Sequence, residues 1–218
     1  MGVRERRERE KAELRARIVE AATQLFVDEG IPNVSIRKIA DRIEYSPATI
    51  YLYFRDKEHL LSCVCGETFA QLKRQLDGTR SDKDPVAGLR RGLRIYIDFA
   101  LQHPQHYLLT FCTPHTHYAV AAGSPEYEQA NTAGLEAFDV LRQALTLCRD
   151  AGAAQFEDLE ATAQAVWSFI HGTASLLITC YDDPGFPWVA KEKLIESSLD
   201  LVMKALGAGA KKTKGGRR

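Results

Sequence analysis

The sequence predicts an all-α protein with about nine helices, in which an N-terminal three-helix unit of the helix-turn-helix type precedes a larger helical domain. Apolar residues recur at intervals of three and four along most of the chain, as in amphipathic helices. Serine or aspartate precedes several of these stretches and glycine or proline follows them, which is the usual pattern at helix ends. No stretch alternates apolar and polar residues between hairpin turns, so no strands are predicted.

The N-terminal helices are recognised by their end signals. The first has a charged start of about ten residues without an apolar face, which we expect to be frayed, and it ends at Gly30. Ser35 and Ser46 can each cap a short helix, and Pro47 presets the first turn of the second of these. Asp56 is the predicted cap of a fourth helix. We expect these helices at about 4–29, 36–43, 47–54 and 57–78.

A second series of helices follows a polar stretch around residues 79–84. We expect them at roughly 85–102, 104–112, 125–151, 158–181 and 187–206. The glycine-rich basic end of the chain has nothing to bury, so we expect it to be disordered. The predicted organisation is a helix-turn-helix domain (1–57), a larger helical domain (58–206) and a basic tail (207–218).

Composition excludes several classes of protein. The 218 residues contain 29 basic and 29 acidic side chains, and residues 1–60 contain 12 and 11, so net charge does not indicate a nucleic-acid partner. The five cysteines are an odd number without a CxxC pair, which favours reduced thiols that pack as small apolar groups. The charged start and the lack of 18 consecutive apolar residues predict a soluble, cytoplasmic protein without a membrane partner.

The most informative stretch is SIRKIADRIEYSPATIYLYFRDK, from Ser35 to Lys57. Two short helices joined by a tight turn bury little alone, so they should pack on the first helix, with Ala40, Ile43 and Ile50 at the crossing. A helix held in this way fits the major groove of DNA. The residues PATIYLYFRDKEHLL then resemble the third-helix signature of the TetR family of bacterial transcription regulators, and the resemblance covers about the first 65 residues.

The resemblance implies a homodimeric regulator, by family default a repressor, that binds a palindromic operator in double-stranded DNA. Lys57 is the strongest candidate for a phosphate contact, because it begins a helix whose backbone N–H groups also attract anions. Phe54 is expected in the core, and Tyr51 is expected to pack its ring and leave its hydroxyl free. The DNA-contacting residues that the resemblance implies are Ser35, Arg37, Ser46, Pro47, Ala48, Thr49, Tyr51, Tyr53 and Lys57.

The turn between the two short helices departs from the family pattern. The family usually has glycine where this chain has Glu44. A left-handed conformation there would cost a residue with a side chain about 1 kcal/mol. The sequence therefore implies either a different turn or a tolerated strain.

The second domain carries a weaker resemblance. Residues 167–172 are similar to the W-x-x-x-H-G motif of one class of TetR-type C-terminal domains. Trp167 and His171 stand one helical turn apart, and a structural pair in the core is the alternative to a ligand contact. The family binds small-molecule effectors in such domains, and we name no effector. The residues that could line a pocket are Tyr96, Phe99, Tyr107, Phe111, Phe138, Trp167 and His171.

The last two helices, at about 158–181 and 187–206, have apolar faces wider than a monomer needs. In the family such helices pair across a two-fold axis, and a palindromic operator also requires a dimer. We predict a homodimer through these helices.

Three alternatives remain open at this stage. A helical enzyme would need a catalytic motif, and the chain has no GxSxG, P-loop, HExxH or dinucleotide motif, so we predict no enzyme and no cofactor. A protein-interaction module would leave the capped unit from Ser46 to Lys57 unexplained. A metal site is disfavoured because prolines break the segment and no carboxylate lies in it, although imidazoles and thiols gather there. These residues are His103, His106, Cys112, His115 and His117.

Overall fold

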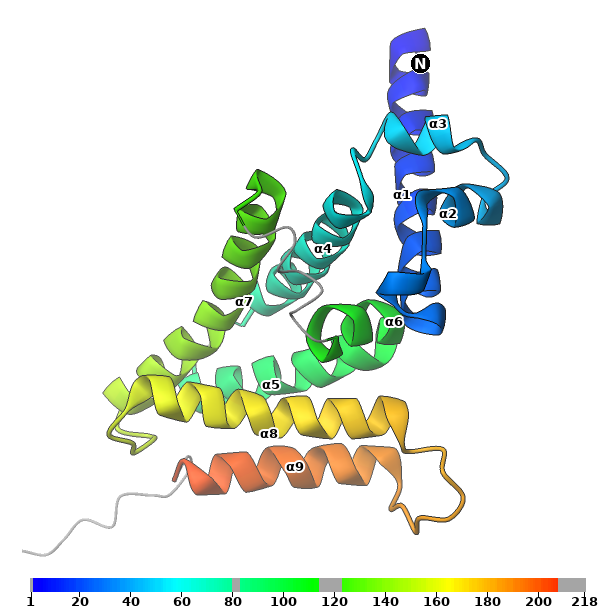
Figure 1. The fold of residues 1–218 in the computed structure, drawn as a ribbon. Helices are drawn as coiled ribbons and strands as arrows, with labels where there is room; N and C mark the ends of the chain where they lie inside the picture. Colours follow the sequence, from blue (N-terminus) through cyan, green and yellow to red (C-terminus); the bar gives the residue numbers. More distant parts are fainter. Residues whose placement is uncertain (1, 80–82, 114–122, 208–218) are drawn as a thin grey trace, which may run out of the picture. The chain divides into compact units, whose positions relative to one another are not determined.

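The structure is a computed structural model that describes residues 2–79, 83–113 and 123–207, and all of the regular secondary structure in these ranges is helical. These ranges contain nine α-helices, one 3₁₀ turn, one π-helical turn and no strand, which confirms the predicted fold class (Figure 1). The α-helices are α1 (Val3–Glu29), α2 (Ile36–Arg42), α3 (Pro47–Tyr51), α4 (Lys57–Asp77), α5 (Pro85–Gln102), α6 (Pro104–Tyr107), α7 (Pro125–Asp150), α8 (Leu159–Thr179) and α9 (Lys191–Ala205). The two turns are η1 (Ile31–Asn33) and η2 (Leu108–Cys112).

The helices form two compact units. Unit 1 comprises residues 1–70 and 103–134, and unit 2 comprises residues 71–102 and 135–218. Helices α4 and α7 each contribute residues to both units. The functional boundary after residue 57 that the sequence suggests is a different division, and it stays a prediction.

The predicted caps stand at the starts of α2, α3 and α4. Ser35 Oγ accepts a hydrogen bond from Lys38 N at 3.3 Å, and Ser46 Oγ accepts one from Thr49 N at 3.2 Å. Asp56 Oδ1 accepts from His59 N at 2.7 Å at the start of α4. These bonds satisfy backbone N–H groups that have no partner inside their helices, so each helix has a defined first residue.

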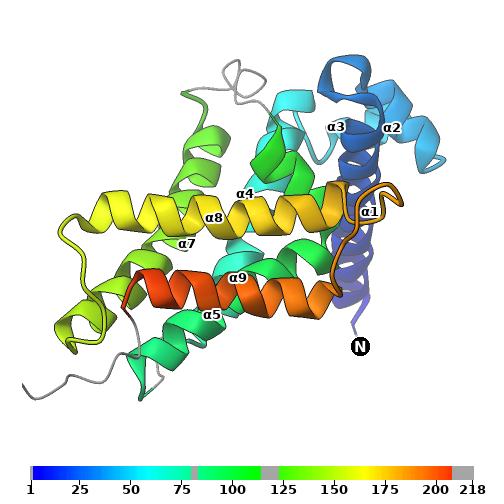
Figure 2. The same cartoon turned by 90° about the horizontal axis from the view of Figure 1, so that it is seen from below.

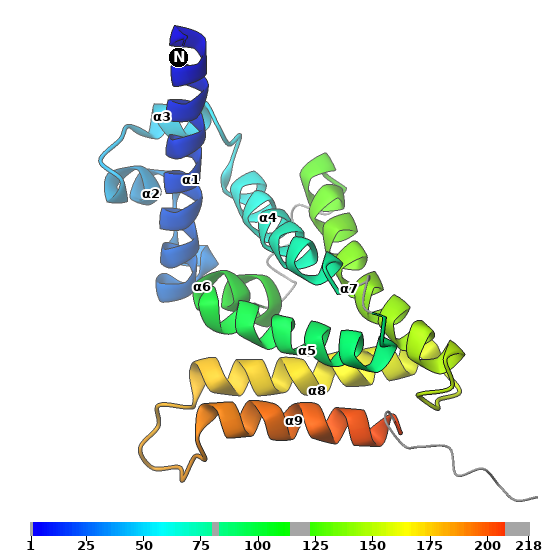
Figure 3. The same cartoon turned by 180° about the vertical axis from the view of Figure 1, so that it is seen from behind.

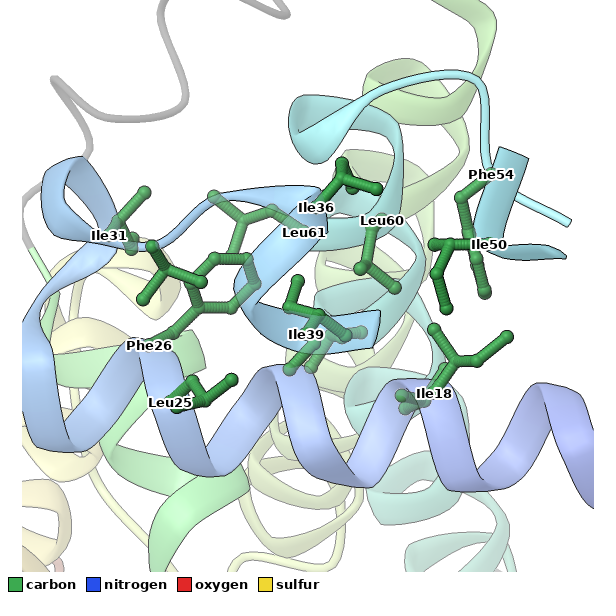
Figure 4. Close-up of a cluster of buried hydrophobic side chains, with 14 of the residues drawn as sticks. Ile18, Leu25, Phe26, Ile31, Ile36, Ile39, Ile50, Phe54, Leu60 and Leu61 are labelled. Atoms are coloured by element: carbon green, nitrogen blue, oxygen red, sulfur yellow. The ribbon is translucent and has the colours of Figure 1, made fainter. Parts of the chain in front are cut away.

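One hydrophobic cluster holds α1, α2, α3 and the start of α4 together (Figure 4). Ile18, Ile39 and Ile50 are completely buried in it, and Ala40 is buried where a larger side chain would separate the helices. Ile43 is also buried, which confirms the crossing that the sequence predicts. Phe54 is 1% exposed and is a core residue, as expected.

The segment from α6 to η2 belongs to the same unit. Leu109 of η2 is buried in the cluster described above. His106 lies between α1 and α4, because its Nε2 is 3.2 Å from Glu20 Oε2 and its Nδ1 is 3.4 Å from Thr68 Oγ1. Unit 1 is therefore made from two separate stretches of the sequence.

Unit 2 is built on α5, α8 and α9. Helices α8 and α9 lie side by side, and α5 runs along both (Figures 2 and 3). Between α5 and α9, Arg94 pairs with Glu196 at 3.0 Å and with Glu192, and Arg90 pairs with Asp200 at 2.7 Å. This series of ion pairs links the partly exposed edges of the two helices.

The start of α1 and the end of α3 differ from the predicted helices, and two other predicted segments lie outside the described residues. The charged start of the chain is helical from Val3 rather than frayed, and residues 4–13 are exposed. Helix α3 ends at Tyr51, earlier than predicted. The polar residues 80–82 and the tail 208–218 lie outside the described residues.

The five cysteines are free thiols, but only Cys65 and Cys148 are buried, while Cys112 and Cys180 are exposed. Burial raises the pKa of Cys148 to about 11, and its thiol donates to Pro85 O at 3.2 Å. Within residues 2–79, 83–113 and 123–207, no helix is both long enough and apolar enough to cross a membrane.

Candidate nucleic-acid interface

The predicted DNA-contacting residues lie on or beside α3 and at the start of α2. Arg37 and Ala48 are exposed, and Pro47 and Thr49 are partly exposed. The hydroxyl groups of Ser46 and Thr49 lie 3.0 Å apart, so the first turn of α3 presents a paired polar edge. The Ser35 hydroxyl accepts one backbone N–H bond and can still donate its own hydrogen, and the Ser46–Thr49 pair uses one hydroxyl hydrogen and leaves the other, so both sites can donate to phosphate oxygens.

The two tyrosines exchange the roles that the sequence suggests. Tyr51 is 56% exposed, so its ring is available as well as its hydroxyl. Tyr53 is partly buried and packs against the core cluster. Helix α3 ends at Tyr51, Leu52 keeps right-handed helical dihedral angles, and Tyr53 N donates to Ile50 O at 2.9 Å, so Tyr53 lies in the turn that follows the helix. Leu52, which the sequence analysis did not single out, is 79% exposed beside Tyr51.

Lys57 is held in place at the start of α4. Its Nζ donates to Ile31 O of η1 at 2.9 Å. An ammonium group has three donors, so this bond positions the charge and leaves capacity for a phosphate. Lys57 therefore links the start of α4 to η1, the turn that precedes α2.

The turn at Glu44 adopts the strained alternative. Glu44 has a φ of 62°, in the left-handed region. Tyr45 N donates to Ala40 O at 3.0 Å and Glu44 N to Asp41 O at 3.2 Å, the pair of bonds that commonly ends a helix with glycine. Arg17 of α1 supports the turn, since its Nη2 donates to Ile43 O at 3.3 Å and its guanidinium lies 5.5 Å from the centre of the Tyr45 ring.

Arg55 forms ion pairs that the sequence analysis did not predict. Its guanidinium is 2.9 Å from Asp56 Oδ2 and 3.6 Å from Glu126 of α7, and the bond to Asp56 raises the pKa of the guanidinium. Partial burial opposes ionisation of Asp56, but bonds from His59 N and Arg55 lower the pKa of Asp56 overall. Because residues 55 and 126 are far apart in the sequence, spacing could not reveal this contact.

In unit 2, four of the predicted pocket residues meet. Trp167 Nε1 donates to Tyr96 Oη at 3.1 Å, and Tyr96 Oη is 3.2 Å from His171 Nδ1. An indole N–H can only donate, so the Tyr96 hydroxyl hydrogen is available for His171 Nδ1. Phe138 completes the group, with its ring 5.9 Å from that of Trp167. Trp167 is 38% exposed, so the cluster reaches the surface of the chain.

The other predicted pocket residues lie elsewhere. Phe99 is buried in unit 2, and Tyr107 and Phe111 lie in unit 1 with ring centres 5.0 Å apart. A pocket that includes all seven residues stays a prediction. Within the described ranges, no three histidine, cysteine or acidic side chains are grouped to hold a metal, and His115 and His117 lie outside these ranges.

Comparisons with known proteins identify the family. Residues 18–64 match the model of bacterial regulatory proteins of the tetR family, which covers α2, α3 and parts of α1 and α4. Residues 89–203 match the model of the tetracyclin repressor-like C-terminal domain, which covers more than half of the chain. The chain belongs to the TetR family.

Individual relatives of this TetR-family chain are distant. The transcriptional repressor KstR of Mycobacterium tuberculosis is 33% identical over 76 residues, which are 35% of this chain and 32% of KstR, so the match spans about a third of that relative. PfmR of Thermus thermophilus has a similar fold, with a TM-score of 0.70 at 19% identity over 86% of this chain and 97% of PfmR. AibR, solved with isovaleryl coenzyme A and operator DNA, has a TM-score of 0.70 at 17% identity over 89% and 98% of the two chains.

The strained turn of this TetR-family chain predicts a stabilising substitution. Glu44→Gly is expected to raise the unfolding free energy by up to about 1 kcal/mol, because glycine adopts the left-handed region without steric cost. Glu44→Ala is the matched control, since it removes the same charge but keeps Cβ. Thermal unfolding followed by circular dichroism measures both. Equal gains in the two variants would show that charge, and not backbone strain, is responsible.

The His171 cluster predicts a pH dependence of stability. Burial lowers the pKa of His171 below its ordinary value of about 6.5, so the unfolded chain binds the proton more tightly than the folded chain does. Its contribution to stability is therefore complete above about pH 6.5 and decreases as pH falls toward the folded pKa. His171→Gln is expected to flatten this dependence in unfolding titrations between pH 7.5 and about 5. An unchanged slope in the variant would assign the effect to other groups.

Proposed function

We propose that the chain is a cytoplasmic transcription regulator that places α3 in the major groove of operator DNA. The observation that supports this most directly is the contrast within one short segment: Ile50 and Phe54 are buried anchors, while Ala48 and Tyr51 are exposed. Caps at Ser46 and Asp56 hold both ends of this segment. A fixed, exposed helix of this kind suits readout of base edges, with hydroxyl groups and Lys57 positioned for phosphates.

We also propose that the regulator acts as a homodimer through α8 and α9. Phe169 and Leu176 of α8 and Leu201 of α9 are 42%, 48% and 58% exposed, whereas their neighbours Ile170, Leu177 and Val202 are buried. Phe169 and Leu176 are seven residues apart and share one face of α8. A symmetric partner that covers these side chains would set the spacing of two α3 helices for a palindromic site.

Repression and modulation by a small-molecule effector are the remaining parts of the proposal. KstR is named a repressor, and AibR was solved with both an acyl coenzyme A and operator DNA, so the fold accommodates both kinds of ligand. The cluster of Tyr96, Trp167 and His171 is the part of unit 2 that we propose for effector contact. The same hydrogen bonds support the further proposal that unit 2 belongs to the W-x-x-x-H-G class of TetR-type C-terminal domains. Catalysis forms no part of the proposed function, because the matching relatives are regulators.

Selection from a random-sequence duplex library tests DNA binding without knowledge of the operator. The unchanged protein is expected to enrich a palindrome, with affinity that decreases steeply as salt increases. Tyr51→Ala and Lys57→Gln are expected to lose this binding, whereas Arg74→Ala, which removes an exposed cation from α4 in unit 2, is expected to retain it. Failure of the unchanged protein to enrich any sequence, with and without cell extract as a source of effector, would contradict the proposed function.

A further inference from the structure

The first turns of α1 carry a row of exposed cations. Arg4, Arg7 and Lys11 are exposed, and none of them forms an ion pair within residues 2–79, 83–113 and 123–207. The other two arginines of this stretch do pair along the helix, Arg6 with Glu10 at 3.4 Å and Arg9 with Glu13 at 3.8 Å. The stretch is nearly neutral overall, but its charges are unevenly arranged: the side that carries Arg4, Arg7 and Lys11 also carries Glu8 and keeps a net charge of +2.

The unpaired row continues the buried face of α1. Arg4 and Lys11 lie fourteen and seven residues before Ile18, and residues seven apart occupy almost the same face of a helix. Ile18 is completely buried against the cluster that contains Ile50 of α3 (Figure 4). The cations therefore lie on the same side of α1 as the packed helices, but in its first turns, which are exposed and do not contact the core.

The row extends beyond α3. Arg15 lies level with the end of the α3 segment, since its guanidinium is 5.2 Å from the centre of the Phe54 ring. At 1.5 Å per residue, Lys11, Arg7 and Arg4 follow at about 6, 12 and 16 Å along the axis. Within unit 1, α1 continues past α3 on the side away from α2 and α6 (Figures 1 and 3). These turns project from the end of the unit that presents α3.

We infer that Arg4, Arg7 and Lys11 form a second DNA-contacting site, which binds phosphates of the duplex flanking the sequence that α3 reads. The inference rests on the proposed function, because it places the DNA at the α3 end of unit 1. Phosphate oxygens are the partner that a row of exposed, unpaired cations beside a DNA-facing helix fits. Such contacts position the protein and carry no sequence information, so this site adds affinity and not specificity.

A matched pair of double variants tests the inference. Arg7→Gln with Lys11→Gln removes two cations from the unpaired row, and Arg6→Gln with Arg9→Gln removes two from the paired row of the same turns. Each phosphate contact contributes about 0.9 to the slope of log affinity against log salt, so the first variant is expected to reduce that slope by about 4 in a dimer. When salt is raised from 50 to 200 mM, both proteins lose affinity, and the factor by which the variant loses it is expected to be about 100 times smaller than the factor for the unchanged protein. The second variant is expected to keep the slope.

Duplex length provides the second readout. On a duplex that ends at the selected palindrome, the Arg7 and Lys11 variant is expected to bind like the unchanged protein. A difference should appear when about ten base pairs are added at each end, and the preferred sequence should stay the same. Equal slopes for the unchanged protein and this variant on the long duplex would overturn the inference alone, as would an equal loss in the Arg6 and Arg9 variant. Absence of any DNA binding by the unchanged protein would overturn the inference together with the proposed function.

Discussion

Phe54→Ala is expected to cost about 3–5 kcal/mol of unfolding free energy and to abolish DNA binding. Phe54 is 1% exposed, and its ring makes an edge contact with His59 at 5.7 Å between ring centres. Because the surrounding helices are fixed by their caps, the cavity left by the ring cannot close easily, and α3 loses the anchor at its C-terminal end. Urea unfolding followed by circular dichroism measures the loss.

Tyr51→Ala is the control for that result, since it removes an aromatic ring from the same segment. Tyr51 is 56% exposed, so its removal is expected to change the unfolding free energy by no more than about 0.5 kcal/mol. DNA affinity is nevertheless expected to fall at least tenfold. If Tyr51→Ala unfolds as easily as Phe54→Ala, or if it binds DNA normally, the assignment of buried and DNA-facing sides to this segment is wrong.

Leu176→Glu combined with Leu201→Glu is expected to convert a dimer into a 24.4 kDa monomer. Both side chains are about half exposed in the single chain, so the substitutions leave its core intact while placing charges where a partner would need apolar contacts. Affinity for an operator with two half-sites should then fall by about 10²–10⁴-fold, because the second half-site is no longer bound by a linked α3.

Leu147→Glu is the matched control for this experiment. Leu147 is 50% exposed on α7 of unit 2, so the same charge enters at an equally open position on another helix. This variant is expected to remain dimeric in light scattering. A monomer from Leu147→Glu, or a dimer from the double variant, would place the dimer interface somewhere other than α8 and α9.

Local chemistry explains why much of the fold could be predicted. The caps at Ser35, Ser46 and Asp56 act over three residues, so the sequence alone locates the helix starts. The small side chain of Ala40 and the branched side chain of Ile50, both buried, mark where the two short helices cross, and this too can be recognised from nearby residues alone. The ring of Tyr51 was predicted to pack and is exposed, whereas Tyr53 packs against the core cluster from the turn that follows α3.

Features that depend on distant residues could not be predicted. Because Glu44 stands where the family usually has glycine, the sequence left open whether the turn is left-handed or of a different kind. The structure has the left-handed turn, which is supported by Arg17, 27 positions earlier in the chain. The contact of Arg55 with Glu126 joins the loop that precedes α4 to α7 across a long stretch of chain. In unit 2, the spacing of Trp167 and His171 predicted their proximity, but only folding brings Tyr96 between them as a shared hydrogen-bond partner.

The composition of unit 1 limits how this protein can be divided or recombined. Helices α2 and α3 share their core with Leu109, and α6 reaches α1 and α4 through His106, although more than thirty residues separate α6 from the first stretch of the unit. An N-terminal fragment that ends at residue 57 or 70 would therefore expose part of its own apolar core to water. A chimaera that transfers this DNA specificity to another regulator would have to carry residues 103–134 as well, so insertion and exchange of domains in this chain cannot follow a single cut.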